Sequence, residues 1–317
     1  MAKALITGGA GFIGSHVVER FLAAGYAVEV LDDLSKGVRA NVPPHVTLHA
    51  LDIRSGDAAA LVRTSGFDVI AHLAAQTDVR ASVVDPLHDA GTNILGSVNL
   101  LDAVRTQSGQ PCCRYVFVST GGTLYGEVAG APSSETTPAN PDSPYGVGKL
   151  AAEHYAAQYG RVHGLDVLTL RLGNVYGPRQ DPLGEAGVVA IFCGRIAAGL
   201  PLTVFGDGEQ VRDYVYVGDV AEAVLAAARR PLPPAGPLDA RAFNIGTGAG
   251  TSVLTLAQMI GRVAGVTPTL VFESERLGEL RRSVLDVSKA AQTLGWRPTT
   301  ALEAGLAATY GAVRSGR

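Results

Sequence analysis

The sequence predicts an α/β protein built on a doubly wound parallel (Rossmann) sheet, with a smaller C-terminal α/β domain. In the first half, short apolar or β-branched runs alternate with amphipathic stretches. Such alternation, with near-continuous apolar strands, is typical of a parallel sheet covered on both faces. After residue 175 the alternation becomes irregular. We therefore expect one domain over residues 1–175, with return segments near 206–230, and a second domain mainly over 176–317.

Each element follows from its local pattern of apolar residues. In the first half we expect strands over 3–7, 27–31, 46–51, 69–73, 115–119 and 167–171, and helices over 12–24, 86–107 and 145–163. In the second half we expect a helix over 188–198 and strands over 203–205, 214–217, 243–245 and 269–272. Further helices are expected after Asp219, Ser252 and Thr300, whose residue types cap helix N-termini.

Composition and charge favour a small-molecule partner. The 317-residue chain is 47% hydrophobic and 17% charged, with a formal net charge of -3. No basic block indicates binding to nucleic acid or to an anionic membrane, and no apolar run approaches the roughly 20 residues that span a bilayer. Cys112, Cys113 and Cys193 form neither a disulfide framework nor a metal-ligand spacing. We therefore expect no metal site and a cytoplasmic location.

A glycine-rich turn follows the first expected strand. In TGGAGFIG, Gly8, Gly11 and Gly14 directly precede a helix, and such a turn lets backbone amides and the positive end of the helix dipole approach a pyrophosphate. Asp32 stands at the end of the second strand, where a carboxylate binds ribose hydroxyls and repels a 2′-phosphate. The combination predicts NAD rather than NADP as the cofactor.

Other residues of the predicted NAD site lie at the helix start or at the carboxyl ends of strands, where ligands bind in open α/β sheets. They are Phe12, Ile13, Asp33, Ser35, Gly37, Asp52, Ile53, Leu73, Ala74 and Ala75. The small side chains at positions 74 and 75 allow a dinucleotide to come close to the backbone.

A tyrosine and a lysine form the candidate catalytic pair. Tyr145 and Lys149, in SPYGVGK, stand four residues apart at a helix start and share one helix face. The tyrosine pKa, ordinarily about 10, must fall by roughly three pH units for catalysis near neutrality; a lysine ammonium roughly 5 Å away contributes about 3 kcal/mol. The stretch FVSTGGTLYG carries hydroxyls but no acid or base. We therefore expect Tyr145 to be the base, with both residues also contacting NAD.

The chain resembles the extended short-chain dehydrogenase/reductase family. The resemblance rests on TGGAGFIGSH, the acid at 32, HLAA, YGVGK and LRLGNVYGPRQ, and continues through GDGEQVRDYVYVGDVAEA, FNIGTG and RLGELRRSVLDVSKA. Within the family it is most similar to the 4-epimerases that act on UDP-glucose and UDP-galactose. This implies that Tyr145 takes the 4-hydroxyl proton, that C4 gives hydride to NAD, and that hydride returns to the other face of the 4-keto sugar.

The resemblance also implies a UDP-sugar pocket. Asn174 matches a phosphate contact, Val189, Thr203, Val204 and Phe205 the uridine wall, Arg212 and Arg276 the diphosphate clamps, and Glu279 the group that binds the uridine ribose. Guanidinium groups suit this task because they pair bidentately with phosphate oxygens. The first domain would then bind NAD and the second mainly the nucleotide sugar. The resemblance further implies a homodimer through the helices at 86–107 and 145–163.

Two positions bear on the sugar. Many of these epimerases carry a serine or threonine four residues before the tyrosine of the closing YG, and that position here is Gly121. We expect Thr123, or otherwise Thr120, to supply the hydroxyl. Ser283 matches a position beside the hexose 2-substituent that holds either tyrosine or a small residue, and its small size leaves room for an acetamido group. UDP-N-acetylglucosamine is therefore a predicted second substrate.

Several alternatives stay open. Sugar-nucleotide 4,6-dehydratases carry an Asp-Glu pair in this loop for elimination of water, and decarboxylating UDP-glucuronate enzymes a glutamate. Positions 122 and 123 here are Gly and Thr, so both are less favoured. A UDP-glucuronate 4-epimerase has no discriminating residue against it. A non-catalytic NAD-binding regulator is less favoured because such proteins commonly lack the Tyr/Lys pair.

Overall fold

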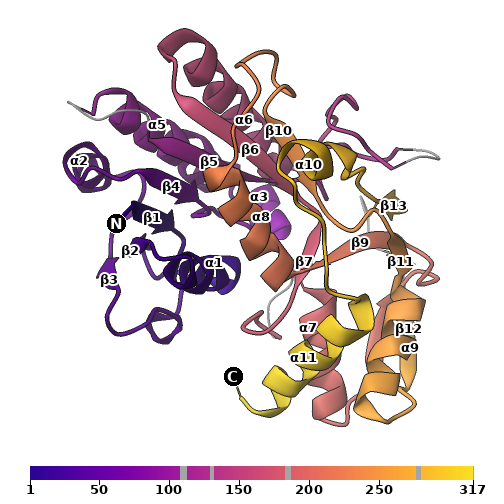
Figure 1. Cartoon of the computed structure of the whole chain (residues 1–317). Helices are drawn as coiled ribbons and strands as arrows, with labels where there is room; N and C mark the ends of the chain where they lie inside the picture. Colours follow the sequence, from indigo (N-terminus) through magenta and orange to yellow (C-terminus); the bar gives the residue numbers. More distant parts are fainter. Residues whose placement is uncertain (108–112, 129–131, 183–186, 276–279, 317) are drawn as a thin grey trace.

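A parallel sheet of seven strands lies at the centre of the described part of the chain (Figure 1). The computed structural model describes residues 1–107, 113–128, 132–182, 187–275 and 280–316. The strands run in the order β10-β6-β5-β4-β1-β2-β3, each parallel to its neighbour. The predicted doubly wound fold is confirmed. The order reverses between β1 and β4, which is where such sheets bind ligands.

The strands of this sheet agree with their predicted ranges to within two residues at each end. They are β1 (Lys3–Thr7), β2 (Ala27–Leu31), β3 (Thr47–His49), β4 (Val69–His72), β5 (Arg114–Thr120), β6 (Asp166–Leu172) and β10 (Ala242–Ile245). The last strand comes from the second half of the chain and pairs with β6. The chain therefore returns to the central sheet after leaving it.

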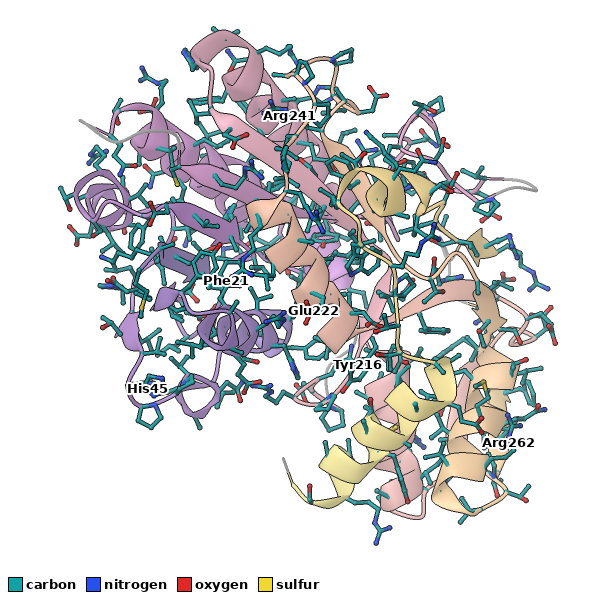
Figure 2. All side chains as sticks on the ribbon, in the orientation of Figure 1. Phe21, His45, Tyr216, Glu222, Arg241 and Arg262 are labelled. Carbon is teal, nitrogen blue, oxygen red and sulfur yellow. The ribbon has the colours of Figure 1, made fainter. Side chains whose placement is uncertain are left out.

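Helices cover both faces of the sheet. One face carries α1 (Phe12–Ala23), α8 (Val217–Arg229) and α10 (Ser288–Thr293); the other carries α2 (Gly56–Thr64), α5 (Ser97–Arg105) and α6 (Pro144–His163). Helices α1 and α8 lie side by side (Figure 1). Figure 2 labels Phe21, which is completely buried in this layer, and Glu222 of α8, which accepts a hydrogen bond from Arg20 of α1.

The predicted helix over 86–107 is helical but not regular. It consists of α4 (Pro86–Ala90), a π-helical turn η2 (Gly91–Gly96) and α5, and it is preceded by α3 (Val79–Val84), which was not predicted. The side chains of Asp78 and Asp85 cap α3 and α4. Single π-helical turns occur often at functional sites, and this one carries the buried Asn93.

A smaller unit follows the first sheet. Its strands are β7 (Asn174–Tyr176), β9 (Val211–Tyr216), β11 (Gly250–Ser252) and β13 (Arg282–Ser283), all paired to β9, and the separate pair β8 (Leu202–Phe205) and β12 (Leu270–Glu273). Helices α7 (Val188–Ala197), α9 (Val253–Ala264) and α11 (Leu302–Arg314) pack together in a core of their own. Figure 1 shows these three helices at the end of the molecule away from β3.

Of the three predicted helix caps, one is confirmed and two are wrong. Ser252 caps α9 by accepting a hydrogen bond from the Thr255 amide. Asp219 lies inside the first turn of α8, and its carboxylate instead accepts hydrogen bonds from Thr299 and Thr300. Those amides precede α11, whose N-cap is Ala301 rather than Thr300. Asp219 thus joins the start of α8 to the C-terminal segment.

Candidate active site

The turn after β1 is packed backbone to backbone. Gly8 has φ +70°, a conformation that favours glycine, and a Cβ on Gly8 would lie 2.7 Å from the Ala74 nitrogen. A Cβ on Gly14 would lie 2.0 Å from the Gly8 oxygen. The N-cap of α1, Gly11, has no side-chain hydrogen bond, so the first amides of this helix are left for a ligand. This cradle fits a dinucleotide pyrophosphate.

Asp32 lies beside this cradle. Its carboxylate is 6% exposed and accepts hydrogen bonds from the Ala10 and Leu34 amides, both at 2.9 Å. Burial raises its pKa. An ionised carboxylate has about four acceptor positions, so it retains capacity for ribose hydroxyls. Gly37 is close against it, because a Cβ at that residue would lie 2.5 Å from Asp32 Oδ1.

The remaining predicted NAD residues line the same edge of the sheet. Asp33 is exposed and binds the amide and hydroxyl of Ser35. Asp52 forms an unpredicted ion pair with Arg54, which lowers the Asp52 pKa. Ile53 is buried. Leu73, Ala74, Ala75, Phe12 and Ile13 are partly buried, and the amides of Leu73 and Ala74 donate to Thr7 Oγ1.

Helix α6 presents the predicted catalytic pair. Ser143 caps the helix by accepting from the Gly146 amide at 3.2 Å, and Pro144 occupies its first turn. Lys149 is 3% exposed, and its Nζ lies 4.4 Å from the centroid of the Phe117 ring, close enough for a cation–π interaction. Burial lowers the Lys149 pKa to about 8, while the nearby carboxylates of Glu153 and Asp89 oppose that change.

Thr120, at the end of β5, lies beside the Tyr145 hydroxyl and acts on its pKa. Thr123 Oγ1 in turn donates to Thr120 Oγ1 at 3.2 Å. The geometry thus favours Thr120, rather than the preferred Thr123, as the hydroxyl beside Tyr145. Burial raises the Tyr145 pKa to about 12, with the charge of Asp89 adding to this and Thr120 opposing it. The expected lowering is therefore not found in the protein alone.

The glycine at position 121 has a packing cause. A Cβ there would lie 2.7 Å from Cδ1 of Leu285, which is completely buried. No side chain at 121 fits while Leu285 holds this place. Of the two neighbouring threonines, Thr120 is the one that acts on Tyr145.

The predicted substrate residues are only partly brought together. Asn174 begins β7, and its Oδ1 is buried with no hydrogen-bond partner among the described residues. Ser283 pairs in register with Arg212 of β9, and its Oγ donates to the Gly122 oxygen at 3.4 Å. Position 283 therefore adjoins the loop that carries Thr120.

The four residues of the expected uridine wall differ in their burial. Val189 and Val204 are buried in the apolar core of the smaller unit, whereas Thr203 and Phe205 are partly exposed. The two valine side chains therefore contribute no exposed surface to the expected wall. Arg276 and Glu279 lie outside the described residues.

Sequence reasoning missed a buried polar cluster beside the catalytic pair. Asp89, in α4, is 1% exposed. Its Oδ2 accepts from Gln76 Nε2 at 2.9 Å and from Asn93 Nδ2 at 3.0 Å. The signal in the sequence was the i, i+4 spacing of Asp89 and Asn93. That spacing alone does not reveal burial.

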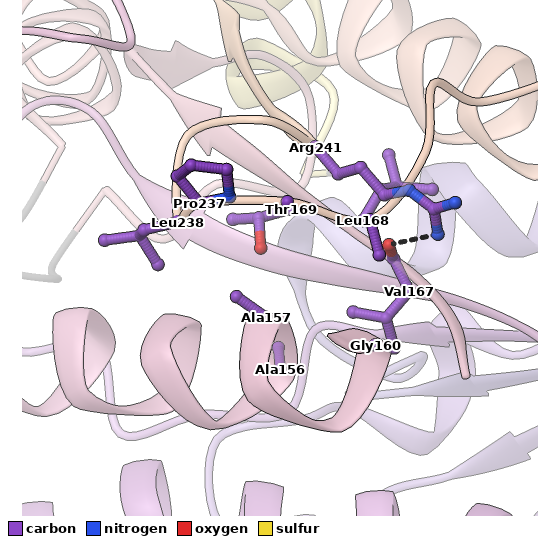
Figure 3. Close-up of a pocket in the computed structure, with 11 residues that line it drawn as sticks. Ala156, Ala157, Gly160, Val167, Leu168, Thr169, Pro237, Leu238 and Arg241 are labelled. Atoms are coloured by element: carbon purple, nitrogen blue, oxygen red, sulfur yellow. Dashed lines mark hydrogen bonds between the residues drawn. The ribbon is translucent and has the colours of Figure 1, made fainter. Parts of the chain in front are cut away.

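A small cavity between α6 and β6 lies elsewhere (Figure 3). Its lining includes Ala156, Val167, Pro237, Leu238 and Arg241. Arg241 Nη1 donates to the Val167 oxygen at 3.5 Å. Val167 and Arg241 stand at the amino ends of β6 and β10. The candidate site lies at the carboxyl ends of the strands, so this cavity is at the opposite end of the strands.

Among the described residues, no helix has the length and apolar character required to cross a membrane. The same residues contain no group of three or more His, Cys, Asp or Glu side chains that could hold a metal ion.

The chain belongs to the NAD dependent epimerase/dehydratase family, whose profile matches residues 4–246. It is 43% identical over 312 residues to the UDP-glucose 4-epimerase of Mycolicibacterium smegmatis, with 97% of each chain covered. It is similar to the crystal structure of Thermotoga maritima UDP-glucose 4-epimerase with UDP-glucose (TM-score 0.93, 42% identity, 99% of both chains). It is also similar to Thermus thermophilus UDP-glucose 4-epimerase complexed with NAD (TM-score 0.90, 43% identity, 99% and 100% covered). The family suggested by the motifs is confirmed.

Proposed function

We propose that this protein is an NAD-dependent 4-epimerase that interconverts UDP-glucose and UDP-galactose. The observation that carries the proposal is the placement of Thr120 beside the Tyr145 hydroxyl, with Lys149 one helical turn further along α6. This group lies at the carboxyl end of β5, on the same edge of the sheet as the glycine cradle. The relatives described above, one crystallised with UDP-glucose and one with NAD, support the same assignment.

The proposed chemistry divides between protein and cofactor. When bound, NAD supplies the acceptor and donor of hydride at C4. Tyr145 holds the proton that leaves and returns to the sugar 4-oxygen, and Thr120 orients that oxygen by hydrogen bonding. The charge of Lys149 stabilises the phenolate form of Tyr145. Residues 117–126 carry no acid or base, so nothing in this loop assists elimination of water.

We further propose that the two parts of the fold divide the substrates. The NAD-binding part would comprise residues 1–175 together with α8 and β10, because α8 packs on α1 and β10 extends the central sheet. The nucleotide sugar would lie mainly against residues 176–317. Asn174 Oδ1, where the two parts meet, is buried and has no hydrogen-bond partner within the described part of the chain, which supports a polar ligand at this point.

A homodimer through helices 86–107 and 145–163 stays a proposal, and the exposed apolar side chains support it. On these segments they are Leu87, Leu95, Val147, Tyr155 and Val162, and the neighbouring α3 adds Val83 and Val84. Apolar side chains gathered on two neighbouring helices mark an interaction surface. Sedimentation at micromolar concentration should give twice the chain mass, and Leu87→Glu should give monomers. Val266→Glu, at an exposed valine elsewhere, should remain dimeric.

The experiment that tests the function is an assay of purified protein with UDP-glucose. We expect formation of UDP-galactose, and acid extraction should release NAD. Bound cofactor without turnover would indicate a regulator, and recovery of only NADP would overturn the cofactor assignment. The same assay with UDP-glucuronate tests the remaining epimerase alternative.

A cytoplasmic location is likewise part of the proposal and rests on the cysteine pattern. The described cysteines, Cys113 and Cys193, are both buried.

A further inference from the structure

A buried carboxylate lies against the catalytic helix. Asp89 is 1% exposed, and its Oδ2 is held by the neutral amide groups of Gln76 and Asn93. Aspartate is seldom buried to this degree without a cationic partner. The sequence and the proposed chemistry give this residue no role, so its burial requires an explanation.

The second carboxylate oxygen points at α6. A Cβ built on Gly148 would lie only 2.9 Å from Asp89 Oδ1. Within the described residues Oδ1 is buried and has no hydrogen-bond partner. Gly148 directly precedes Lys149 and follows Tyr145 by three residues. The absence of a side chain at 148 thus lets an anion approach the part of the helix that carries the catalytic pair.

We propose that Asp89 is a positioning residue of this active site, the buried anion that keeps Lys149 charged over the pH range in which Tyr145 acts. The inference rests on the proposed roles of Tyr145 and Lys149. Asp89 acts through its charge, and the lack of a side chain at Gly148 leaves room for the Asp89 carboxylate.

A second carboxylate, Glu153, also opposes the lowering of the Lys149 pKa, and its effect is larger than that of Asp89. However, Glu153 is already paired with the guanidinium of Arg171 at 2.7 Å, so much of its charge is neutralised. Asp89 is held by amides that carry no charge, and its negative charge remains available to Lys149.

The charges around Asp89 come from a few elements. On α6, the charge of Lys149 lowers the Asp89 pKa, and the charge of Asp89 raises the Tyr145 pKa. On α4 itself, the exposed His88 also lowers the Asp89 pKa. The packed neighbour α3 carries Arg80, which is exposed, and η2 carries no titratable side chain. The negative charge of Asp89 raises the pKa values of both Lys149 and Tyr145, so its removal should lower both.

The first test is the pH profile of kcat/KM for the NAD-loaded enzyme. In Asp89→Asn, the acidic limb should move to lower pH because Tyr145 ionises more readily. The basic limb should move the same way because Lys149 loses its proton sooner. We expect each shift to be about one pH unit. A matched control is Asp85→Asn, which removes an exposed charge from the N-cap of the same helix and keeps a capping residue type. Its profile should match wild type.

The second test needs no turnover. The lysines of the chain are Lys3, Lys36, Lys149 and Lys289, few enough for the Cε signals of ¹³C-lysine protein to be resolved. The Lys149 signal is the one that disappears in Lys149→Arg. With NAD bound, this signal should titrate at lower pH in Asp89→Asn than in wild type. An unchanged Lys149 titration would overturn the proposal. Because this result does not depend on the substrate, failure of the epimerase assignment would be seen separately in the activity assay.

Gly148→Ala provides an independent variant. Alanine is favoured over glycine inside a helix, and the atom it would meet is the end of a side chain that can turn away. Displacement of Asp89 should shift both limbs of the pH profile in the same direction as Asp89→Asn, but by less. A loss of activity that is the same at every pH, in both variants, would show a purely structural role and refute the proposal.

Discussion

Arg171 and Glu153 form an ion pair of 2.7 Å in which the two side chains are 2% and 0% exposed. Arg171 lies on β6 and Glu153 on α6, one turn beyond Lys149. Arg171 Nη1 also donates to the hydroxyl of Tyr125 at 2.9 Å. The pair therefore joins the catalytic helix to the end of the loop that carries Thr120.

Removal of one charge from this pair should destabilise the protein strongly. Glu153→Gln leaves the Arg171 guanidinium buried without its counter-charge, and such changes cost about 3–5 kcal/mol. Urea unfolding would measure the effect. The control is Asp102→Asn, which breaks the exposed pair with Arg105 and should change stability by less than about 1 kcal/mol. Equal losses of stability in the two variants would show that burial does not determine how much an ion pair contributes to stability.

The two threonines of the loop should differ in their effect on turnover. Thr120→Val removes the hydroxyl beside Tyr145, and we expect kcat to fall by about 10²-fold. Thr123→Val removes only the donor to Thr120, so the loss should stay below about tenfold. Both variants keep the shape of the side chain. Steady-state kinetics with UDP-glucose measures both losses. A larger loss of kcat for Thr123→Val would show that Thr123 supplies the hydroxyl, as the sequence predicted.

The glycine cradle should not tolerate a methyl group. Gly14→Ala places a Cβ 2.0 Å from the Gly8 oxygen, so the backbone must move. We expect destabilisation by about 1–3 kcal/mol and loss of bound NAD. Gly311→Ala is the control, because nothing lies within 4 Å of its Cβ in the exposed interior of α11. It should stabilise the protein by about 0.5–1 kcal/mol. Thermal unfolding and cofactor extraction test both, and NAD retained by Gly14→Ala would refute the cradle.

Position 283 should control which sugars enter. Ser283 lies 3.4 Å from the Gly122 oxygen, beside the catalytic loop, and its small side chain leaves space. We therefore expect turnover of UDP-N-acetylglucosamine as well as UDP-glucose, and Ser283→Tyr should abolish only the former. The kcat/KM values of the two substrates in both proteins provide the test. A tyrosine variant that still accepts the acetamido sugar would place the gate elsewhere.

The sequence predicted most of the central sheet because its strands are apolar runs bounded by glycines and charged residues. The glycine turn and Asp32 were recognisable because their spacing is fixed by the backbone around a pyrophosphate. Strands β7, β11 and β13 were not predicted. They have only three, three and two residues, too few for periodicity to appear.

The parts of the site that escaped prediction depend on tertiary packing. Asp89 is buried where α6 packs against α4, and no local pattern in the sequence shows that packing. The lack of a side chain at Gly121 is explained by Leu285, which is more than 160 residues away in the chain. Likewise, the Tyr145 pKa depends on burial and on a carboxylate that the local motif does not contain.

The most direct test of the account is conversion of UDP-[4-²H]glucose by the purified protein in ordinary water. If C4 gives up its hydrogen as hydride and receives it back at the same site, the UDP-galactose formed should retain deuterium at C4. Tyr145→Phe should slow this conversion by roughly 10²-fold or more while keeping bound NAD. Absence of UDP-galactose, or product that has exchanged its C4 deuterium with solvent, would contradict the proposed function.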